Sequence, residues 1–193
     1  PLPTSATIKA KSKVTGLVDK GADKGALILT ERTLKDAESG LDLATLTSTT
    51  FARGNGGYDG PSDEAPRPHK VPEREPDFAV DLTTLDMAAL IYRLSGDYNP
   101  LHASPSVAKA AGFPKPILHG LCSLGVAGHA ILKGCCDYDA KRLKSLQLRF
   151  SSPVYPGETV RTEIWRDGAN ISFKSKIVER DVVVLDNGHA TVE

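Results

Sequence analysis

Apolar and polar positions alternate in short runs over the first fifty residues. Three such runs, rich in leucine and β-branched residues, cover Ala6–Val18, Gly25–Leu34 and Leu41–Phe51. Glycine, aspartate and lysine separate them, which is typical of strands joined by tight polar turns. The pattern predicts an antiparallel three-stranded meander at the start of the chain.

The second half of the chain interleaves helical and strand patterns. The predicted helices cover Leu85–Leu94, a short segment from Ser104 or Ser106 to Ala111, and His119–Lys133. Thr84 is the expected cap of the first helix, and Gly112 the expected end of the second. The predicted strands cover Phe78–Leu82, Leu143–Ser151, Glu158–Arg166, Ala169–Glu179 and Val182–Val192. Small residues along the longest helix, such as Gly125, Ala127 and Gly128, suit close wrapping by a sheet, so an α+β fold is expected.

A glycine- and proline-rich stretch separates the two halves. Residues Gly54–Asp77 contain Gly54-Asn-Gly-Gly57 and repeated prolines, a composition typical of an extended linker. The expected organisation is a partial N-terminal unit over residues 1–55, a linker over residues 56–77 and a C-terminal unit over residues 78–193.

A faint internal repeat relates the two units. The segment that begins at Pro1 resembles the segment that begins at Pro153, and each precedes a run of strands. Two copies of one architecture are therefore expected. The first copy has no helical module before its strands, so we expect that the chain starts inside its first unit.

Composition excludes several classes of function. The 193 residues carry 24 basic and 24 acidic side chains, which leaves no basic field for nucleic acid or anionic lipid. No apolar run is long enough to span a membrane, and no signal peptide is visible. The three cysteines fit neither a disulfide framework nor a metal site, so reduced thiols are expected.

The segment Tyr92-Arg-Leu-Ser-Gly-Asp-Tyr-Asn-Pro-Leu-His102 carries the candidate chemistry. It places the carboxylate of Asp97 five residues before the imidazole of His102, with Asn99 and Pro100 forming a turn between them. An acid and a base at fixed separation suit proton transfer. The alternative is a turn-capping aspartate and a histidine packed in a polar core, which is the usual meaning of this spacing in isolation.

A second segment, Pro116-Ile-Leu-His-Gly-Leu-Cys-Ser123, leads into the longest predicted helix. Free backbone N–H groups at a helix start can stabilise a developing oxyanion, which makes Gly120 a candidate donor. Close helix packing also explains this glycine, and the two explanations are compatible. We interpret His119 and His129 as structural, and Cys122 as no nucleophile.

Both segments resemble the MaoC-like hydratases, and in particular their (R)-specific enoyl-CoA hydratase 2 group. The match includes Ser95-Gly-Asp-Tyr-Asn-Pro-Leu-His102, Ala111–Leu121 and Arg149-Phe-Ser-Ser-Pro-Val-Tyr-Pro-Gly-Glu158. The resemblance implies a double hot-dog fold, in which an antiparallel sheet wraps round a long central helix. It also implies an N-terminal unit that is truncated here and lacks its helix, which makes room for bulky acyl chains.

The resemblance also implies roles for individual residues. Asp97 and His102 would activate a water molecule, Asn99 would orient the water or the thioester, and the Gly120 N–H would stabilise the enolate oxygen. The residues expected to contact acyl-CoA are Tyr98, Pro100, Leu101 and Phe150, with Lys20 near the phosphates. No metal or other cofactor is expected, since acyl-CoA is the substrate.

The expected activity is reversible syn addition of water to trans-2-enoyl-CoA, giving (3R)-3-hydroxyacyl-CoA in fatty-acid β-oxidation. Two alternatives are a (3R)-hydroxyacyl dehydratase acting on acyl-carrier-protein substrates, and a hot-dog module that binds acyl-CoA without turnover. A homodimer is expected because exposed sheet edges commonly pair. The resemblance implies a peroxisomal location, or a cytoplasmic one if the chain is bacterial.

Overall fold

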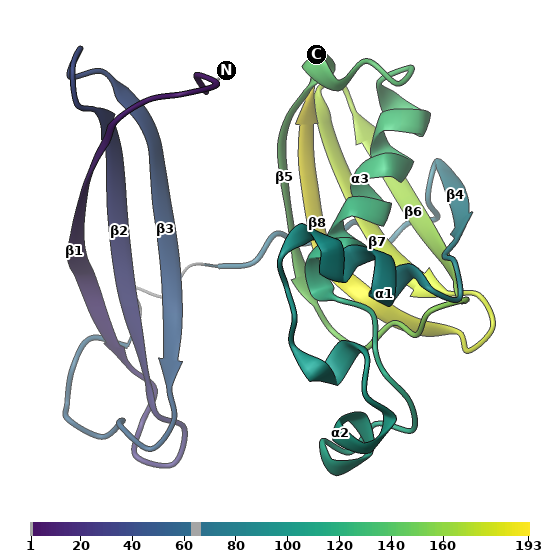
Figure 1. Ribbon diagram of the computed structural model, residues 1–193, viewed down its shortest axis with the longest axis horizontal. Helices are drawn as coiled ribbons and strands as arrows, with labels where there is room; N and C mark the ends of the chain where they lie inside the picture. Colours follow the sequence, from purple (N-terminus) through teal and green to yellow (C-terminus); the bar gives the residue numbers. More distant parts are fainter. Residues whose placement is uncertain (1, 63–66) are drawn as a thin grey trace. The chain divides into compact units, whose positions relative to one another are not determined.

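The computed structural model describes residues 2–62 and 67–193. Its contacts divide the chain into two units, Pro1–Arg67 and Pro68–Glu193. Each unit has its own antiparallel sheet (Figure 1). No helix in the described ranges is both long and apolar enough to cross a membrane.

The first unit is the predicted meander. Its strands pair in the order β1-β2-β3 and cover Ile8–Asp19, Ala26–Asp36 and Asp42–Ala52. A register shift between Val14 and Gly16 interrupts the pairing of β1 with β2. Residues 2–62 contain no helix, as the sequence predicted for this unit.

The carboxylate of Asp19 closes the end of this sheet. It accepts hydrogen bonds from the backbone N–H groups of Gly57, Gly21 and Tyr58, each at 2.8 Å. These bonds, led by the one from Gly57, lower the pKa of Asp19. The start of the expected linker is therefore tied to the end of β1.

The second unit is a five-stranded antiparallel sheet in the order β4-β6-β7-β8-β5. Its strands cover Phe78–Thr83 (β4), Leu143–Phe150 (β5), Thr159–Asp167 (β6), Asn170–Ile177 (β7) and Val182–Val192 (β8). The helix α3, Gly120–Cys135, lies against one face of this sheet (Figure 1). This is the hot-dog arrangement, so the predicted α+β fold is confirmed.

Alternation along the central strands builds the core between the sheet and α3. Val160 and Ile164 of β6 and Ile171 and Phe173 of β7 are fully buried and pack with Ile131 of α3. The polar side chains at two other inward positions satisfy each other, since Thr162 and Ser175 share a 2.9 Å hydrogen bond between hydroxyls. The predicted period-two pattern therefore marks the buried face.

Small residues allow α3 to lie close to the sheet, as predicted. Ala127, Gly128 and Ala130 are buried against it. A Cβ atom added at Gly134 would lie 2.6 Å from Cε2 of Phe78. Close approach of the backbone to β4 therefore requires glycine at this position.

The first predicted helix differs from the observed one. The helix α1 covers only Ala88–Tyr92 and continues as a 3-10 turn, η1, over Arg93–Ser95. The prediction that Thr84 caps it is wrong, because the Thr84 hydroxyl donates to the Glu158 carbonyl at 3.0 Å and accepts from the Gly157 N–H at 3.0 Å. Contacts with a distant segment replace the local cap.

The helix α2, Pro105–Ala110, follows Ser104, and Gly112 ends it with a φ of +88°. The Ser104 side chain makes no cap hydrogen bond but contacts the Ser106 hydroxyl at 3.0 Å. The start and end of this helix are therefore as predicted. One further 3-10 turn, η3, covers Ala140–Arg142 before β5.

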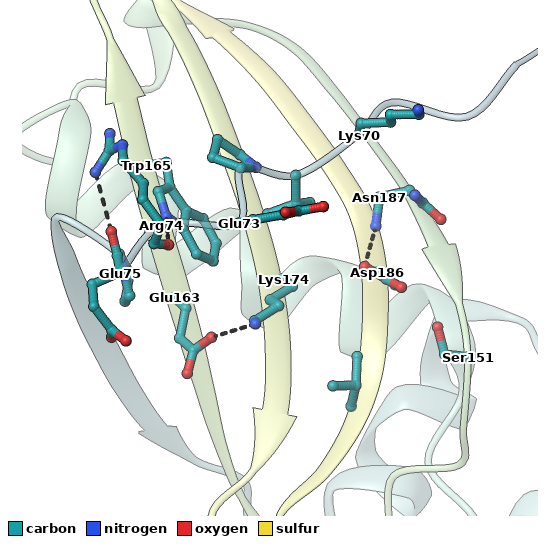
Figure 2. A pocket seen from close by; sticks show the side chains of 14 residues that line it. Lys70, Glu73, Arg74, Glu75, Ser151, Glu163, Trp165, Lys174, Asp186 and Asn187 are labelled. Atoms are coloured by element: carbon teal, nitrogen blue, oxygen red, sulfur yellow. Dashed lines mark hydrogen bonds and ion pairs between the residues drawn. The ribbon is translucent and has the colours of Figure 1, made fainter.

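Residues 68–77, here called the strap, lie along the face of the sheet that α3 does not cover. The indole N–H of Trp165 donates to the Arg74 carbonyl at 2.8 Å, and the side-chain amide of Asn187 donates to the His69 carbonyl at 2.7 Å. The strap and the sheet border an open hollow of about 790 Å³, which Lys174 and Glu163 also line (Figure 2). This stretch is fixed to the second unit by side-chain hydrogen bonds.

Candidate active site

His102 ends a 3-10 turn, η2, over Pro100–His102. The side-chain carbonyl of Asn99 caps the turn by accepting from the Leu101 N–H at 3.0 Å, and Pro100 fixes the first dihedral. His102 is 8% exposed, and its Nδ1 lies 2.8 Å from the Ile117 carbonyl oxygen. Because a carbonyl can only accept, Nδ1 carries the proton and Nε2 of the neutral ring keeps a free lone pair.

Asp97 lies in the turn that precedes Asn99. Gly96 allows this turn with a φ of +104°, and the Asp97 carboxylate accepts from the Asn99 N–H at 3.2 Å. The Arg93 guanidinium also stabilises the turn, because it donates to the Tyr98 carbonyl at 3.1 Å. Asp97 is exposed, so its carboxylate is accessible to a ligand.

His119 joins this pair, which the sequence analysis did not predict. Polar side-chain atoms of Asp97, His102 and His119 lie within 4.8 Å of one another. The His119 ring is 1% exposed and stacks on the His102 ring at 3.8 Å between centroids. The sequence could have indicated this, because His119 directly precedes Gly120. A residue just before a helix lies close to any group that the first N–H groups of that helix bind.

Gly120 is the first residue of α3, so its N–H has no acceptor one turn earlier in the helix. A Cβ atom added here would lie 3.3 Å from Cε1 of Phe150, whose ring covers the helix start. His102, Gly120 and Phe150 border one cavity of about 300 Å³. Its remaining lining is Phe113, Ile117, Leu118, Ser123, Ser151, Ser152, Pro153, Val154 and Leu185.

His102 also borders a second hollow, of about 290 Å³. Asp86, Ala89, Leu90 and Lys115 are among the residues that line it. The imidazole is therefore reachable from two hollows although the residue is buried. The larger hollow under the strap includes none of the candidate catalytic residues.

The structure does not gather all the predicted contact residues at this cavity. Tyr98 is 66% exposed with the Arg93 guanidinium 5.5 Å from its ring centre, and neither Pro100 nor Leu101 lines either hollow beside His102. Lys20 lies in the first unit, in the turn after β1, where its N–H donates to the Gly25 carbonyl at 3.0 Å. Contact of these residues with acyl-CoA stays a prediction.

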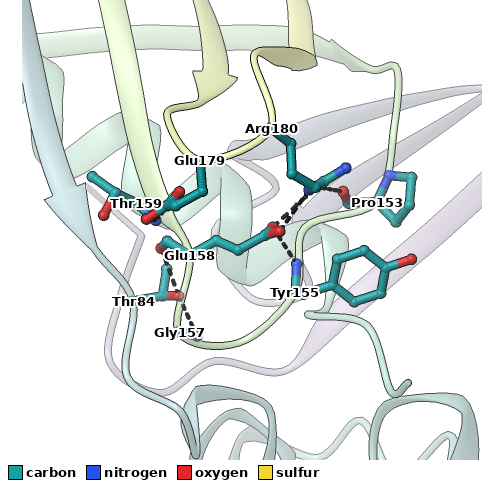
Figure 3. A network of polar contacts seen from close by, with 8 residues as sticks. All are labelled: Thr84, Pro153, Tyr155, Gly157, Glu158, Thr159, Glu179 and Arg180. Atoms are coloured by element: carbon teal, nitrogen blue, oxygen red, sulfur yellow. Dashed lines mark hydrogen bonds and ion pairs between the residues drawn. The ribbon is translucent and has the colours of Figure 1, made fainter. Parts of the chain in front are cut away.

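Pro153 and Val154 line the cavity and begin the loop Pro153–Gly157. Glu158 anchors this loop (Figure 3). The Glu158 carboxylate accepts from the Tyr155 N–H at 2.8 Å and from the Arg180 guanidinium at 2.6 and 3.0 Å. Arg180 also donates to the Pro153 carbonyl at 2.8 Å. The carboxylate raises the pKa of Arg180, so this guanidinium stays charged.

The three cysteines offer no competing nucleophile. Cys135 and Cys136 are buried, Cys122 is half-buried, and all three are free thiols. Burial raises the pKa of each thiol, which disfavours the reactive thiolate. This agrees with the interpretation of Cys122 from the sequence.

Comparison with curated proteins finds relatives across nearly the whole chain. The 3-hydroxyacyl-thioester dehydratase Y of Mycobacterium tuberculosis is 42% identical over 97% of this chain, which spans 67% of that protein. The peroxisomal enoyl-CoA hydratase 2 of Arabidopsis thaliana is 41% identical over 96% of this chain, which spans 62% of that protein. The peroxisomal multifunctional enzyme type 2 of Mus musculus is 40% identical over 98% of this chain, which spans 25% of that protein.

Solved structures with the same fold are also found. A MaoC-like dehydratase from Phytophthora capsici superposes with a TM-score of 0.82 at 42% identity, over 96% of this chain and 64% of that one. The full-length peroxisomal multifunctional enzyme type 2 of Drosophila melanogaster superposes with a TM-score of 0.81 at 40% identity, over 100% of this chain and 35% of that one. The model of the MaoC-like domain matches residues 68–188, which include all of the polar cluster described above. With relatives about 40% identical over nearly its full length, the chain belongs to the MaoC-like family, as its two motifs indicated.

Proposed function

We propose that this chain is an (R)-specific 2-enoyl-CoA hydratase, which adds water to trans-2-enoyl-CoA and gives (3R)-3-hydroxyacyl-CoA. The observation that carries the proposal is the position of His102, whose Nε2 keeps a free lone pair. The Asp97 carboxylate lies close to this imidazole, and His102 and Gly120 line the same cavity. A base, an acid and an oxyanion donor are the groups that this reaction requires.

The chemistry balances with these groups and one water molecule. One member of the Asp97–His102 pair removes a proton from water as the oxygen bonds to C3 of the enoyl thioester. The electrons move to the thioester oxygen, where the Gly120 N–H stabilises the enolate. The enolate then collapses and C2 takes a proton from the pair on the same face, so addition is syn. Asn99 holds the turn, because its side-chain carbonyl is bonded to the Leu101 N–H.

The named relatives support the substrate class. Two carry the name enoyl-CoA hydratase 2, and a third is named for dehydration of 3-hydroxyacyl thioesters, which is the same reaction in reverse. We propose acyl-CoA as the substrate and fatty-acid β-oxidation as the setting. Acyl-carrier-protein thioesters are the competing substrates, and a parallel assay with the same acyl group on both carriers separates the two.

The deciding experiment measures hydration of trans-2-enoyl-CoA substrates of increasing chain length and determines the configuration at C3. We expect (3R) product from the wild type. Asp97→Asn and His102→Gln should lower kcat by roughly 10²–10⁴-fold and leave the fold intact. His129→Gln, on the exposed side of α3, is the matched control. Near-normal turnover by both dyad variants, or acyl-CoA binding without turnover by the wild type, would refute the proposal.

The reaction as proposed needs no metal or redox cofactor. The cluster of Asp97, His102 and His119 has a composition that suits a metal ion. However, Nδ1 of His102 and Nε2 of His119 are each hydrogen-bonded to a carbonyl oxygen. We therefore expect dialysis against EDTA to leave kcat unchanged; a loss that zinc or magnesium restores would contradict the metal-free mechanism.

We further propose a homodimer and a peroxisomal location. The edge strands β4 and β5 each pair on one side only within the described sheet, which leaves edges for a second copy. Relatives from Arabidopsis thaliana and Mus musculus are named as peroxisomal, while others are mycobacterial. Light scattering of the purified chain tests the first proposal, and fractionation of the source cells tests the second.

A further inference from the structure

The His119 ring lies between two other rings. Tyr92, the last residue of α1, lies 4.7 Å from it between ring centres, and His102 of η2 stacks on it at 3.8 Å with planes 28° apart. His119 itself immediately precedes α3. Three separate elements therefore meet at one buried imidazole.

A hydrogen bond connects the same ring to the other half of the acid–base pair. Nε2 of His119 lies 3.2 Å from the backbone carbonyl oxygen of Asp97, so this nitrogen carries the proton and donates it. Nδ1 is then an acceptor, and it is buried with no hydrogen-bond partner in the described part of the chain. The His119 side chain thus contacts both members of the pair: its ring stacks on His102, and its Nε2–H bonds to the backbone of Asp97.

The surroundings of His119 favour its neutral form. Burial is the main cause that lowers its pKa, and positive charge on His102 or Arg93 would lower it further. The hydrogen bond to the Asp97 carbonyl and the negative charge of Asp97 act to raise the pKa of His119, but it stays below its ordinary value. A neutral ring can stack closely on His102 while that imidazole exchanges protons with substrate.

We propose that His119 is a positioning residue, which sets the separation of Asp97 and His102 by stacking on one and hydrogen-bonding the backbone of the other. The proposal rests on the hydratase function proposed above and adds a third residue to its acid–base pair. His119 lines neither of the hollows that His102 borders, so its proposed role is to act through Asp97 and His102.

Two substitutions separate positioning from simple packing. His119→Phe keeps a ring for the stack, loses the donor to Asp97 and removes the unpartnered Nδ1. His119→Gln loses the ring but places an amide N–H near the position of Nε2. If the ring only fills space, His119→Phe should be as active as the wild type and at least as stable, because it removes a buried unpaired polar atom.

For a positioning residue we expect a different result. His119→Phe should melt no lower than the wild type, yet its kcat should fall roughly 10²-fold, as expected for a misplaced catalytic group, with KM changed less than kcat. His119→Gln should recover part of this loss. His129→Phe, on the exposed side of α3, is the control and should keep wild-type kcat. Wild-type kcat in His119→Phe would overturn the proposal.

Hydrogen exchange tests the same link without any turnover. The N–H groups of Leu101 and His102 bond to the side-chain and backbone carbonyls of Asn99, inside the turn that the His119 bond holds. Their exchange should be faster in His119→Phe, recover partly in His119→Gln and stay unchanged in His129→Phe. Unchanged exchange in His119→Phe would refute the positioning role. If exchange responds but the wild type hydrates no enoyl thioester, the proposed function fails while the positioning role stands.

Discussion

Glu158 holds one wall of the candidate cavity through a single carboxylate. Its oxygens accept from the Tyr155 backbone and from Arg180, and its side chain is 13% exposed. Arg180 in turn reaches the Pro153 carbonyl. The start and the middle of the loop Pro153–Gly157 thus depend on one ion pair that is largely shielded from water.

The Glu158→Ala variant should show this dependence. Arg180 would lose its partner while still partly buried, so we expect the free energy of unfolding to fall by about 1–3 kcal/mol. The shape of the cavity should also change, which would raise KM for the enoyl thioester. Denaturant unfolding and steady-state kinetics measure the two effects. Asp181→Ala, which removes a surface carboxylate bonded to Lys176, is the control; equal losses in both variants would contradict the assigned role.

At the scale of residues, the sequence predicted the parts of the site that lie close together in the chain. Asp97 and His102 lie close together, and Gly120 is at the start of the long helix, as their positions in the sequence predicted. His119 and Glu158 were missed as contributors, because their contacts with Asp97 and Arg180 join segments that only the fold brings together. A spacing pattern carries no information about such partners.

Two glycines of the helix α3 differ in whether there is space for a side chain. A Cβ atom at the exposed Gly125 would meet nothing within 4 Å, whereas one at Gly134 would lie 2.6 Å from the Phe78 ring. The same substitution at these two positions therefore measures how closely each part of the helix approaches the sheet.

We expect Gly125→Ala to stabilise the chain by about 0.5–1 kcal/mol, because alanine lowers the entropy loss of forming the helix. Gly134→Ala should instead destabilise it by about 1–3 kcal/mol, since Phe78 or the helix must shift. Thermal unfolding of both variants tests the pair. Stabilisation by Gly134→Ala would show that α3 is less closely packed on β4 than described.

At the scale of elements, the predictions were accurate where the pattern was long. The eight strands in the described part of the chain and the long helix lie within a few residues of their predicted bounds, because period-two burial and an apolar helix face are strong signals. The start of α1 was predicted too early. Thr84 looked like a local cap, but its hydroxyl is bonded to Glu158 and Gly157, and tertiary contacts outweighed the local preference.

The strap contributes to the stability of the second unit through His69. Nε2 of His69 contacts the Ser172 hydroxyl at 2.8 Å, and its ring lies 4.6 Å from that of His189. Burial, and then the nearby His189, lower the pKa of His69. Below its ordinary pKa of about 6.5 the unfolded chain binds a proton that the folded chain resists, so the free energy of unfolding falls as the pH drops.

We therefore expect wild-type stability to decline between pH 7 and pH 5.5, before most carboxylates titrate. The melting temperature should fall roughly 2–4 °C more in the wild type than in His69→Gln over this range. Asp77, whose pKa the Arg74 guanidinium and the Arg166 N–H lower to about 2, adds a separate loss only below about pH 4. The exposed His129→Gln variant is the control. Identical pH profiles for His69→Gln and the wild type would contradict the assignment.

The two units differ in how much core they contain. Nearly all of the fully buried apolar residues belong to the second unit, while Val18 and Ala26 are the buried ones among the described residues of the first. A fragment of residues 68–193 should therefore unfold cooperatively, whereas a fragment of residues 1–67 should show no cooperative transition. Circular dichroism during heating measures both. A cooperative transition in the shorter fragment would contradict this account.

The predicted linker shows why organisation at the scale of the molecule is harder to predict. Proline-rich composition indicated an extended segment over residues 56–77. It could not indicate that the side chains of Trp165 and Asn187 donate hydrogen bonds to backbone carbonyls of this segment. Nor could it indicate that the Asp19 carboxylate accepts a hydrogen bond from the Gly57 N–H. Those contacts depend on side chains more than thirty residues away in the sequence.

The polar groups of the candidate site share one property with a practical consequence. Tyr92, Asp97, His102, His119 and Gly120 all belong to one continuous segment, while the ring of Phe150 in β5 lies against the start of α3. The segment runs from α1 to α3, and Leu118 between them packs into the core and donates its N–H to the Val154 carbonyl at 2.7 Å. Transplanting this segment into a hot-dog scaffold that lacks activity would therefore require its cavity wall as well, namely Phe150 and the residues that follow it up to Val154.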